Sequence, residues 1–173
     1  IGNFDGIHKG HNKILEKLKK EARSLNAKSA ILSFDPHPKF YFDNSQRFLI
    51  NSKQKKINIL EQKNIDYLID LKFNQELIDL SHSDFENKIL YENLKLKKIL
   101  IGNDFRYGNK RKGDIETLKS FCEKASILYE NIDLLEDDKN TKISSTQIRE
   151  FLSLGKIEQA NTLLENPFSI KGL

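Results

Sequence analysis

Two histidines near the start of the chain are the side chains best suited to chemistry on phosphate. His8 and His11 lie three residues apart, directly after a run with glycines at Gly2 and Gly6. Glycine lets backbone N–H groups approach a ligand closely, and imidazoles add hydrogen-bond donors or protons. A helical pattern follows at once, and a helix N-terminus carries partial positive charge. The stretch 2–11 therefore predicts an anion site of the kind that holds nucleotide phosphates.

A zinc site is the main chemical alternative for the same histidines. His37 could supply a third ligand, but the chain has a single cysteine, Cys122, and no HExxH-type glutamate accompanies the pair. We therefore expect no metal ligands from the protein. For residues 8–11 taken alone, a glycine turn with surface histidines remains open.

A second candidate segment, residues 143–149, combines hydroxyl groups with an arginine. Ser144, Ser145 and Thr146 stand where a helix is predicted to begin, and Arg149 follows one turn later. Hydroxyls and free N–H groups at a helix N-terminus bind phosphate oxygens, and arginine binds them bidentately. A simple N-cap followed by a surface arginine is the alternative.

Strands that alternate with helices predict a parallel α/β sheet with right-handed crossovers. In such sheets, ligands bind at the carboxyl ends of the strands. The glycine loop, the loop 35–42 and the loop 103–108 all follow predicted strands, so we expect them to converge. The apolar patterns predict strands at 30–34, 67–71, 98–102 and 126–129, and helices at 13–25, 52–64, 83–94, 114–125, 144–154 and 156–165. Residues 132–135 either extend the sheet as a further strand or cross a loop.

Local signals add detail to these elements. Two prolines, Pro36 and Pro38, predict an extended segment rather than regular structure. Ser83 and Glu86 have capping-box spacing, and the helix 52–64 is expected to turn Ile57 inward. The basic run 110–112 is expected to be a solvated turn, with shielding of triphosphate charge as the alternative.

The composition describes a single domain large enough to bury a core. The chain has 173 residues, of which 38% are hydrophobic and 31% charged. It has no signal peptide and no apolar run of membrane-spanning length, and its lone cysteine predicts a reducing, cytoplasmic location. The net charge of +4 comes from interleaved Lys and Glu, which favours a solvated surface over a nucleic-acid stripe. The absence of methionine and the start at Ile1 predict a fragment that lacks the strand before the glycine loop.

Four segments in this order resemble the signature segments of the bacterial FAD synthetase family, the bifunctional riboflavin kinase/FMN adenylyltransferases. The first shares His-x-Gly-His with nucleotidyltransferases generally, whereas the other three together are specific to the flavin enzymes. The segments are Gly2-Asn3-Phe4-Asp5-Gly6-Ile7-His8-Lys9-Gly10-His11, Phe34-Asp35-Pro36-His37-Pro38, Gly102-Asn103-Asp104-Phe105-Arg106-Tyr107-Gly108 and Ile143-Ser144-Ser145-Thr146-Gln147-Ile148-Arg149.

The resemblance implies a Rossmann-like nucleotidyltransferase domain with a mostly parallel sheet flanked by helices and a truncated first strand. Its activity would be transfer of AMP from ATP to FMN, with Mg²⁺, to give FAD. Residues 1–166 would form this domain, and residues 167–173 would begin the linker to a C-terminal riboflavin kinase domain in the parent chain. ATP and FMN would be the partners, with neither nucleic acid nor membrane involved.

The resemblance also implies roles for individual residues. His8, His11 and Arg149 would be catalytic, acting on the ATP phosphates. The nucleotide would lie along Gly2, Asn3, Phe4, Asp5, Gly6 and Gly10, with Ser144, Ser145 and Thr146 closing on its phosphates from the opposite side. The flavin side would comprise Pro36, His37, Pro38, Asn103, Asp104, Phe105, Arg106, Tyr107 and Gly108.

The flavin ring needs a flat apolar surface and polar partners at its edge. The aromatic residues near the two loops could stack on it, and Asn103 and Asp104 could bind its polar edge. These aromatic residues are Phe40, Tyr41, Phe42, Phe105 and Tyr107, and most of residues 40–42 are expected to be structural. Two other functions stay open: adenylyl transfer to another phosphorylated acceptor, such as a pantetheine or nicotinate compound, and RNA binding by a basic module.

Overall fold

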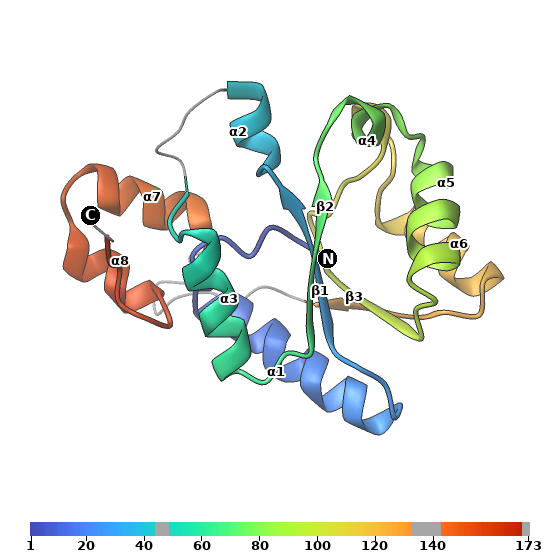
Figure 1. Ribbon diagram of the computed structural model, residues 1–173, viewed down its shortest axis with the longest axis horizontal. Coiled ribbons are helices and arrows are strands. Elements are labelled where there is room, and N and C mark those ends of the chain that lie inside the picture. Colours follow the sequence, from blue (N-terminus) through green and yellow to red (C-terminus); the bar gives the residue numbers. More distant parts are fainter. Residues whose placement is uncertain (44–48, 133–142, 171–173) are drawn as a thin grey trace.

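The strands form two parallel pairs, flanked by helices (Figure 1), in a computed structural model that describes residues 1–43, 49–132 and 143–170. β1 (Ala30–Asp35) pairs with β2 (Tyr67–Lys72), and β3 (Lys98–Gly102) pairs with β4 (Leu128–Ile132). The predicted α/β class with parallel strands is confirmed. The helices are α1 (Lys9–Ser24), α2 (Pro38–Asp43), α3 (Lys53–Gln62), α4 (Gln75–Asp79), α5 (His82–Asp84), the π-helix η1 (Phe85–Asn93), the 3-10 helix η2 (Asn109–Arg111), α6 (Ile115–Lys124), α7 (Ser145–Ser153) and α8 (Ile157–Leu163).

The first two residues lie between the two strand pairs (Figure 1). The backbone N–H of Gly2 donates to the carbonyl of Leu32 in β1 at 3.0 Å, and the amino group of Ile1 donates to the carbonyl of Leu100 in β3 at 3.1 Å. The glycine loop therefore starts beside the middle of β1 and runs toward its carboxyl end, where the carbonyl of Asn3 accepts a hydrogen bond from the hydroxyl of Ser33. This position is the one that ligands favour in parallel α/β folds.

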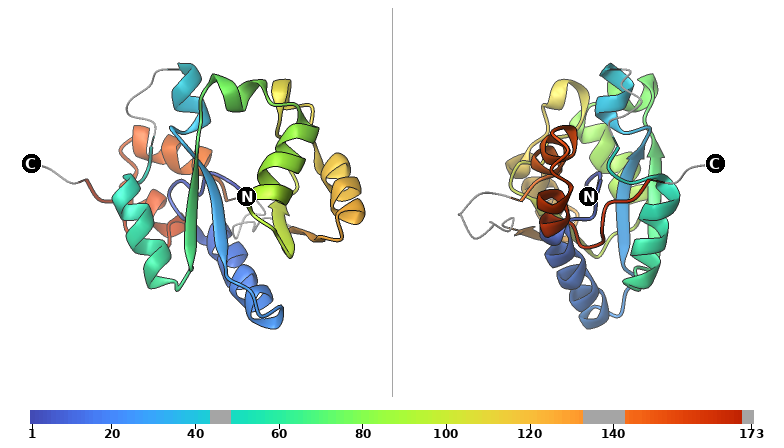
Figure 2. Two further views of the ribbon diagram at one scale, coloured as in Figure 1. Left: turned by 45° about the vertical axis from the view of Figure 1, so that its right-hand side comes forward. Right: turned by 90° about the vertical axis from the view of Figure 1, so that its left-hand side faces the viewer.

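Three apolar clusters hold the elements together. One cluster joins β3 with η1 and α6, a second joins the glycine loop with α1, β1 and α3, and a third joins α7 and α8 with Ile50. Figures 1 and 2 show α7 and α8 on the side of the molecule opposite α6. The glycine loop contributes to the second cluster through Phe4 and Ile7, so the fold packs directly against the segment that carries the histidines.

The first helix begins earlier than its apolar pattern predicts. It starts at Lys9 rather than at residue 13, with His8 as its N-cap, and the His8 imidazole accepts a hydrogen bond from the backbone N–H of His11. Histidine is an uncommon cap, so neither hydrophobic periodicity nor the usual cap residues mark this start. The difference matters because it places His11 within the first helical turn.

Two local predictions about helices were wrong. Residues 38–43 form α2 rather than an extended loop, because a proline is compatible with the first position of a helix. Ser81, not Ser83, caps the short helix α5 that leads into η1, and Glu86 is buried at 6% exposure instead of closing a capping box. Its carboxyl group accepts a hydrogen bond from the hydroxyl of Tyr107, which explains why it turns inward.

Burial and strand ends also differ in places. Ile57 is 37% exposed, and its neighbour Ile59 is buried in its stead. Tyr41 and Phe42 are exposed rather than structural, and their rings contact Phe73 edge-on. The strand predicted at 126–129 runs from Leu128 to Ile132. The further strand or loop predicted at 132–135 falls mostly outside the described residues.

Candidate active site

The loop that carries the histidine pair is buried and conformationally restricted. Phe4 and Ile7 are 3% and 0% exposed, and both have left-handed backbone angles, with φ of 48° and 38°. Such angles are costly for residues with a side chain and persist where packing enforces them. Gly6 has φ of 86°, and a Cβ there would lie 3.1 Å from the Ile50 side chain. The packing therefore holds this loop in one shape.

Asp5 ties this loop to two distant segments. Its carboxylate, in a residue that is 3% exposed, accepts hydrogen bonds from the backbone N–H groups of Ile50 and Asn51 and from the guanidinium of Arg149, the last at 2.6 Å. Its carbonyl oxygen accepts a hydrogen bond from the hydroxyl of Ser145 at the start of α7. Asp5 thus joins the glycine loop to α7 and gives Arg149 a buried partner.

The two histidine rings stack on each other at the start of α1. Their centroids are 3.7 Å apart with 19° between the planes, and the Phe4 ring lies 4.8 Å from His11. Because Nδ1 of His8 accepts from the His11 backbone, a neutral His8 carries its proton on Nε2, where it can donate. Nδ1 of His11 is buried without a hydrogen-bond partner among the described residues.

Gly10 makes room for the His8 ring. A Cβ at this position would lie 3.1 Å from both Cε1 and Nδ1 of His8. Contacts of this length are tighter than ordinary carbon packing, so any side chain here would displace the imidazole. In this structure Gly10 therefore leaves space for the His8 ring, whereas the family resemblance implied that Gly10 lies along the nucleotide.

Burial keeps both imidazoles neutral near pH 7. It lowers the pKa of His8 to about 4, against a smaller opposing effect of Asp5, and it lowers the pKa of His11 well below the ordinary value of 6.5. The pKa of His37 is lowered to about 4 for the same reason. Neutral imidazoles can still donate a hydrogen bond to phosphate oxygens, and a bound anion would favour their protonation.

One pocket of about 360 Å³ collects residues from all four sequence segments. The glycine loop and α1 form one wall, the loop after β3 forms another, and the residues before α7 complete it. The lining comprises Ile1, Gly2, Asn3, Phe4, His8, His11, Ile14, Phe34, Pro38, Gly102, Asp104, Phe105, Arg106, Arg111, Ile143, Ser144 and Ser145.

Several predicted site residues lie elsewhere. Tyr107 is 5% exposed and packs in the core beside Phe85, so its ring cannot stack on a ligand in this conformation. Gly108 has φ of 70° and abuts the backbone of His82. His37 lines a small neighbouring pocket with Asn3 and Asp5. The predicted site residues that do not line the 360 Å³ pocket are Asp5, Gly6, Gly10, Pro36, His37, Asn103, Tyr107, Gly108, Thr146 and Arg149.

Arg111 and Phe34 also line the pocket, although neither was among the predicted site residues. Phe34 was expected at the end of a buried strand, where it opens the second signature segment. Arg111 was expected in a solvated turn, with shielding of triphosphate charge as the alternative. The proximity of Arg111 to a glycine-rich loop was the one available signal. The turn geometry that brings it to the pocket is visible only in the structure.

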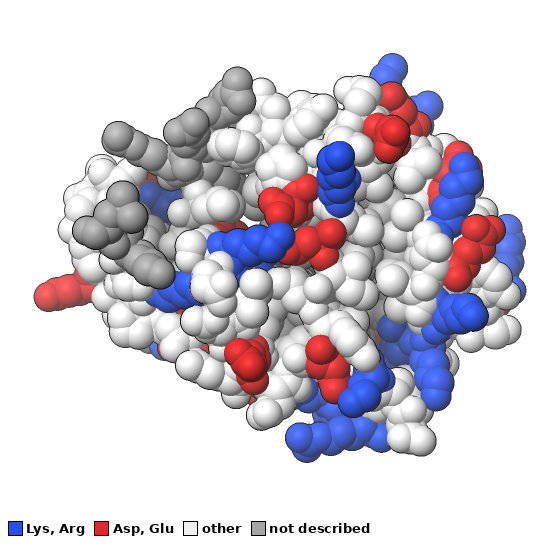
Figure 3. Space-filling model, in the orientation of Figure 1, with Lys and Arg blue, Asp and Glu red and all other residues white. Residues whose placement is uncertain are grey.

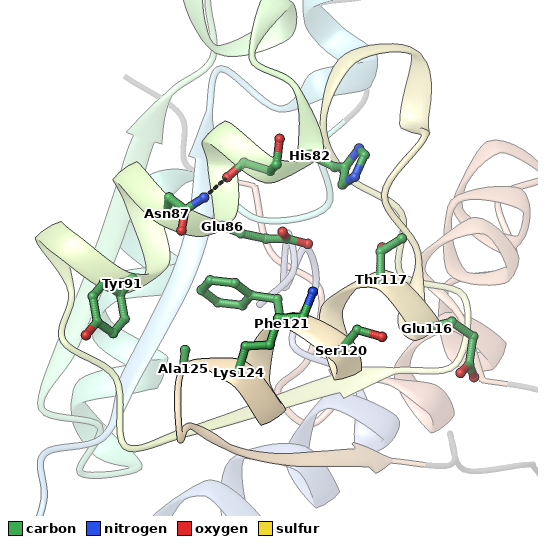
Figure 4. A pocket seen from close by; sticks show the side chains of 11 residues that line it. His82, Glu86, Asn87, Tyr91, Glu116, Thr117, Ser120, Phe121, Lys124 and Ala125 are labelled. Atoms are coloured by element: carbon green, nitrogen blue, oxygen red, sulfur yellow. Dashed lines mark hydrogen bonds between the residues drawn. The ribbon is translucent and has the colours of Figure 1, made fainter.

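A larger pocket, of about 690 Å³, lies between η1 and α6 and contains none of the predicted site residues (Figure 4). Glu86 on η1 and Thr117 on α6 face each other across it. Burial raises the pKa of Glu86, and Tyr107 hydrogen-bonds to both of these residues. Two polar side chains of this pocket, Glu86 and Thr117, therefore fix the position of Tyr107.

Figure 3 shows acidic and basic side chains interleaved over much of one face. Across residues 1–43, 49–132 and 143–170, no group of three or more His, Cys, Asp or Glu residues could hold a metal ion. Within the same ranges, no helix is long and apolar enough to cross a membrane.

Solved structures share this fold. A crystal structure of a protein named macrolide-efflux protein from Streptococcus pneumoniae superposes with a TM-score of 0.84 at 27% identity, over 97% of this chain and 64% of that one. Pantoate-beta-alanine ligase from Francisella tularensis aligns with a TM-score of 0.51 at 14% identity, over 93% of this chain and 76% of that one, which concerns the fold alone.

Comparison of sequences gives the family. Proteins named bifunctional riboflavin kinase/FMN adenylyltransferase are similar over 99% of this chain: 39% identical in Buchnera aphidicola subsp. Schizaphis graminum, 32% in Pseudomonas fluorescens and 30% in Escherichia coli K12. The chain spans about half the length of these relatives, 55% in each case. The family model described as FAD synthetase matches residues 1–147, which is most of the chain. The chain therefore belongs to the FAD synthetase family.

Proposed function

We propose that this chain is an FMN adenylyltransferase, which transfers AMP from ATP to FMN and releases pyrophosphate. The observation that carries the proposal is the pocket in which His8 and His11 meet Ser144, Ser145 and Phe105. The names of the relatives support the flavin as acceptor. An ATP site beside an aromatic wall is what joining a nucleotide to a flavin requires.

The transfer needs positioning rather than a protein nucleophile. An oxygen of the FMN phosphate attacks the α-phosphorus of ATP, a new P–O bond forms, and the bond to the β-phosphate oxygen breaks as pyrophosphate leaves. His8 donates its Nε2 proton as a hydrogen bond to the phosphates, and the hydroxyls of Ser144 and Ser145 hold them from the other wall. Donors arranged in advance toward developing charge contribute about 3 kcal/mol each.

Magnesium fits this site as a companion of ATP. Mg²⁺ keeps most of its water and binds through substrate phosphates and a few protein oxygens. The side-chain oxygen of Asn3, buried and without a hydrogen-bond partner among the described residues, and the carboxylate of Asp104 would hold it. When bound, the ion would neutralise phosphate charge.

The assay is formation of FAD. The protein, ATP, Mg²⁺ and FMN should yield FAD and pyrophosphate, resolved by liquid chromatography, and EDTA should stop the reaction. His11→Ala should lower kcat by about 100-fold or more because a buried donor to the phosphates is lost. His82→Ala, which changes a histidine outside the pocket, is the control. A wild-type protein that adenylylates another phosphorylated acceptor but never FMN would overturn the proposal.

We further propose that residues 1–166 form the adenylyltransferase unit and that residues 167–173 lead toward a riboflavin kinase domain in the parent protein. The bifunctional names of relatives about twice as long support this division. The present chain should then convert FMN but leave riboflavin unphosphorylated. A cytoplasmic location fits the buried Cys122, whose pKa burial raises to about 11 and whose thiol is therefore unreactive.

A further inference from the structure

The turn 107–113 presents Arg111 to the active-site pocket on a rigid base. Its ends are closed by two backbone hydrogen bonds between Tyr107 and Gly113, at 3.1 and 2.9 Å. The Tyr107 hydroxyl bonds to Glu86 and to Thr117, the two side chains that face each other in Figure 4. The backbone N–H of Asn109 donates to the carbonyl of Leu80 at 2.7 Å. The turn is thus attached to η1, α6 and the segment before α5.

The backbone at the tip of this turn is unusual. Lys110 and Arg111 both have left-handed conformations, with φ of 52° and 56°, a conformation that costs a non-glycine residue about 1–2 kcal/mol. Glycine would avoid this cost at either position. The surrounding hydrogen bonds therefore hold the turn in this strained conformation. In this conformation Arg111 lines the pocket, whereas Lys110 and Lys112 do not.

Arg111 brings an uncompensated positive charge to that wall. Its neighbour Arg106 is paired with Asp114 at 2.9 Å, so its charge is largely offset. Across the described ranges, Arg111 has no ion pair and no hydrogen bond to a side chain. Arginine presents two parallel N–H groups that match two oxygens of a phosphate. An arginine free to turn into a pocket lined by His8 and Ser144 is suited to such an anion.

We propose that Arg111 binds the terminal phosphate of the flavin acceptor, an inference that rests on the proposed function. Adenylyl transfer must bring a doubly charged acceptor phosphate against the charged triphosphate of ATP, and this repulsion has to be offset. The histidine pair and the segment before α7 serve the ATP phosphates. Arg111 belongs to the loop that carries Asp104 and Phe105, on the wall assigned to the flavin, and is therefore placed to hold the acceptor.

The test is binding of FMN against riboflavin, which differ by this phosphate. In the Arg111→Gln variant, the dissociation constant for FMN, measured by flavin fluorescence, should rise by about 10- to 100-fold, as expected for loss of a charged hydrogen-bonding partner. The dissociation constant for riboflavin and the KM for ATP should not change. Arg111→Lys keeps the charge but not the bidentate geometry, so its dissociation constant for FMN should lie between those of the wild type and Arg111→Gln.

Lys110→Gln is the matched control, because it removes the same charge from the same turn and the same backbone conformation. It should leave FMN binding unchanged. The inference is overturned if Arg111→Gln raises the KM for ATP alone, weakens FMN and riboflavin equally, or changes nothing. Because binding is measured without turnover, these results are separate from the test of activity. Failure of the wild-type protein to make FAD would instead count against the proposed function.

Discussion

At the scale of single residues, the site depends on small spaces as much as on functional groups. Gly10 is conspicuous in the sequence as part of His-x-Gly-His, where it suggested room for a phosphate. The structure shows that the space it leaves is filled by the His8 imidazole. The histidine pair is stacked and capped in a manner that a side chain at position 10 would disturb.

Gly10→Ala should therefore lower kcat by about 10- to 100-fold, the order expected when a catalytic group is displaced by an ångström. Its thermal midpoint should change little, because the gain in helix propensity from alanine offsets the weakened His8 cap of α1. Gly155→Ala is a control for the backbone effect of the substitution, because Gly155 has φ of 71° and no atom lies within 4 Å of the position that a Cβ would take. Its stability should fall slightly while kcat is retained. Equal kcat values for Gly10→Ala and wild type would contradict this role.

At the scale of elements, Asp5 acts as the junction between the glycine loop, the segment 49–51 and α7. The Asp5 side chain is 4% exposed, and the side chain of its partner Arg149 is 20% exposed. Removing one member of a buried ion pair leaves the other charge without compensation, which is more costly than losing a surface pair. The position of α7, and with it Ser144 and Ser145, depends on this contact.

Asp5→Asn should lower the free energy of unfolding by about 3 kcal/mol, measured by urea denaturation. Glu16→Gln serves as the control, because Glu16 belongs to an ion pair with Lys19 in which its own side chain is 56% exposed. That change should cost less than about 1 kcal/mol. Comparable losses for the two variants would show that the Asp5–Arg149 pair does not join these elements.

At the scale of the whole molecule, burial of histidines makes stability depend on pH. The pKa of His8 in the folded protein is about 4, below its ordinary value of 6.5, so the unfolded chain binds the proton more readily between these values. Protonation therefore favours unfolding as the pH falls through 6.5 toward 4. His11 and His37 act in the same direction.

The free energy of unfolding should accordingly fall between pH 7 and pH 4.5, with His8 alone contributing on the order of 3 kcal/mol once the full interval is crossed. Urea denaturation at several pH values measures this slope. The slope should be shallower in His8→Gln, while His82→Gln, for a histidine outside this cluster, should keep it. A stability that is flat across this range would contradict the burial of neutral imidazoles.

The sequence by itself determined the fold class, the strands 67–72 and 98–102 to within a residue, and the segments that meet at the pocket. These features follow from local patterns: apolar periodicity, serine and aspartate caps, and glycine-rich loops after strands. It could not determine which side chains of those segments line the pocket. Tyr107 and Phe105 stand two residues apart in one motif, yet Tyr107 is in the core and Phe105 lines the pocket.

Tertiary structure alone decided these orientations, because each depends on partners distant in the chain. Asp5 is drawn away from the pocket by Arg149 and the amides of residues 50 and 51. Arg111 lies beside the pocket because hydrogen bonds to Glu86, Thr117 and Leu80 hold its turn in place. Local sequence specifies which groups are available for phosphate chemistry, whereas long-range hydrogen bonds and packing select which of them line the pocket.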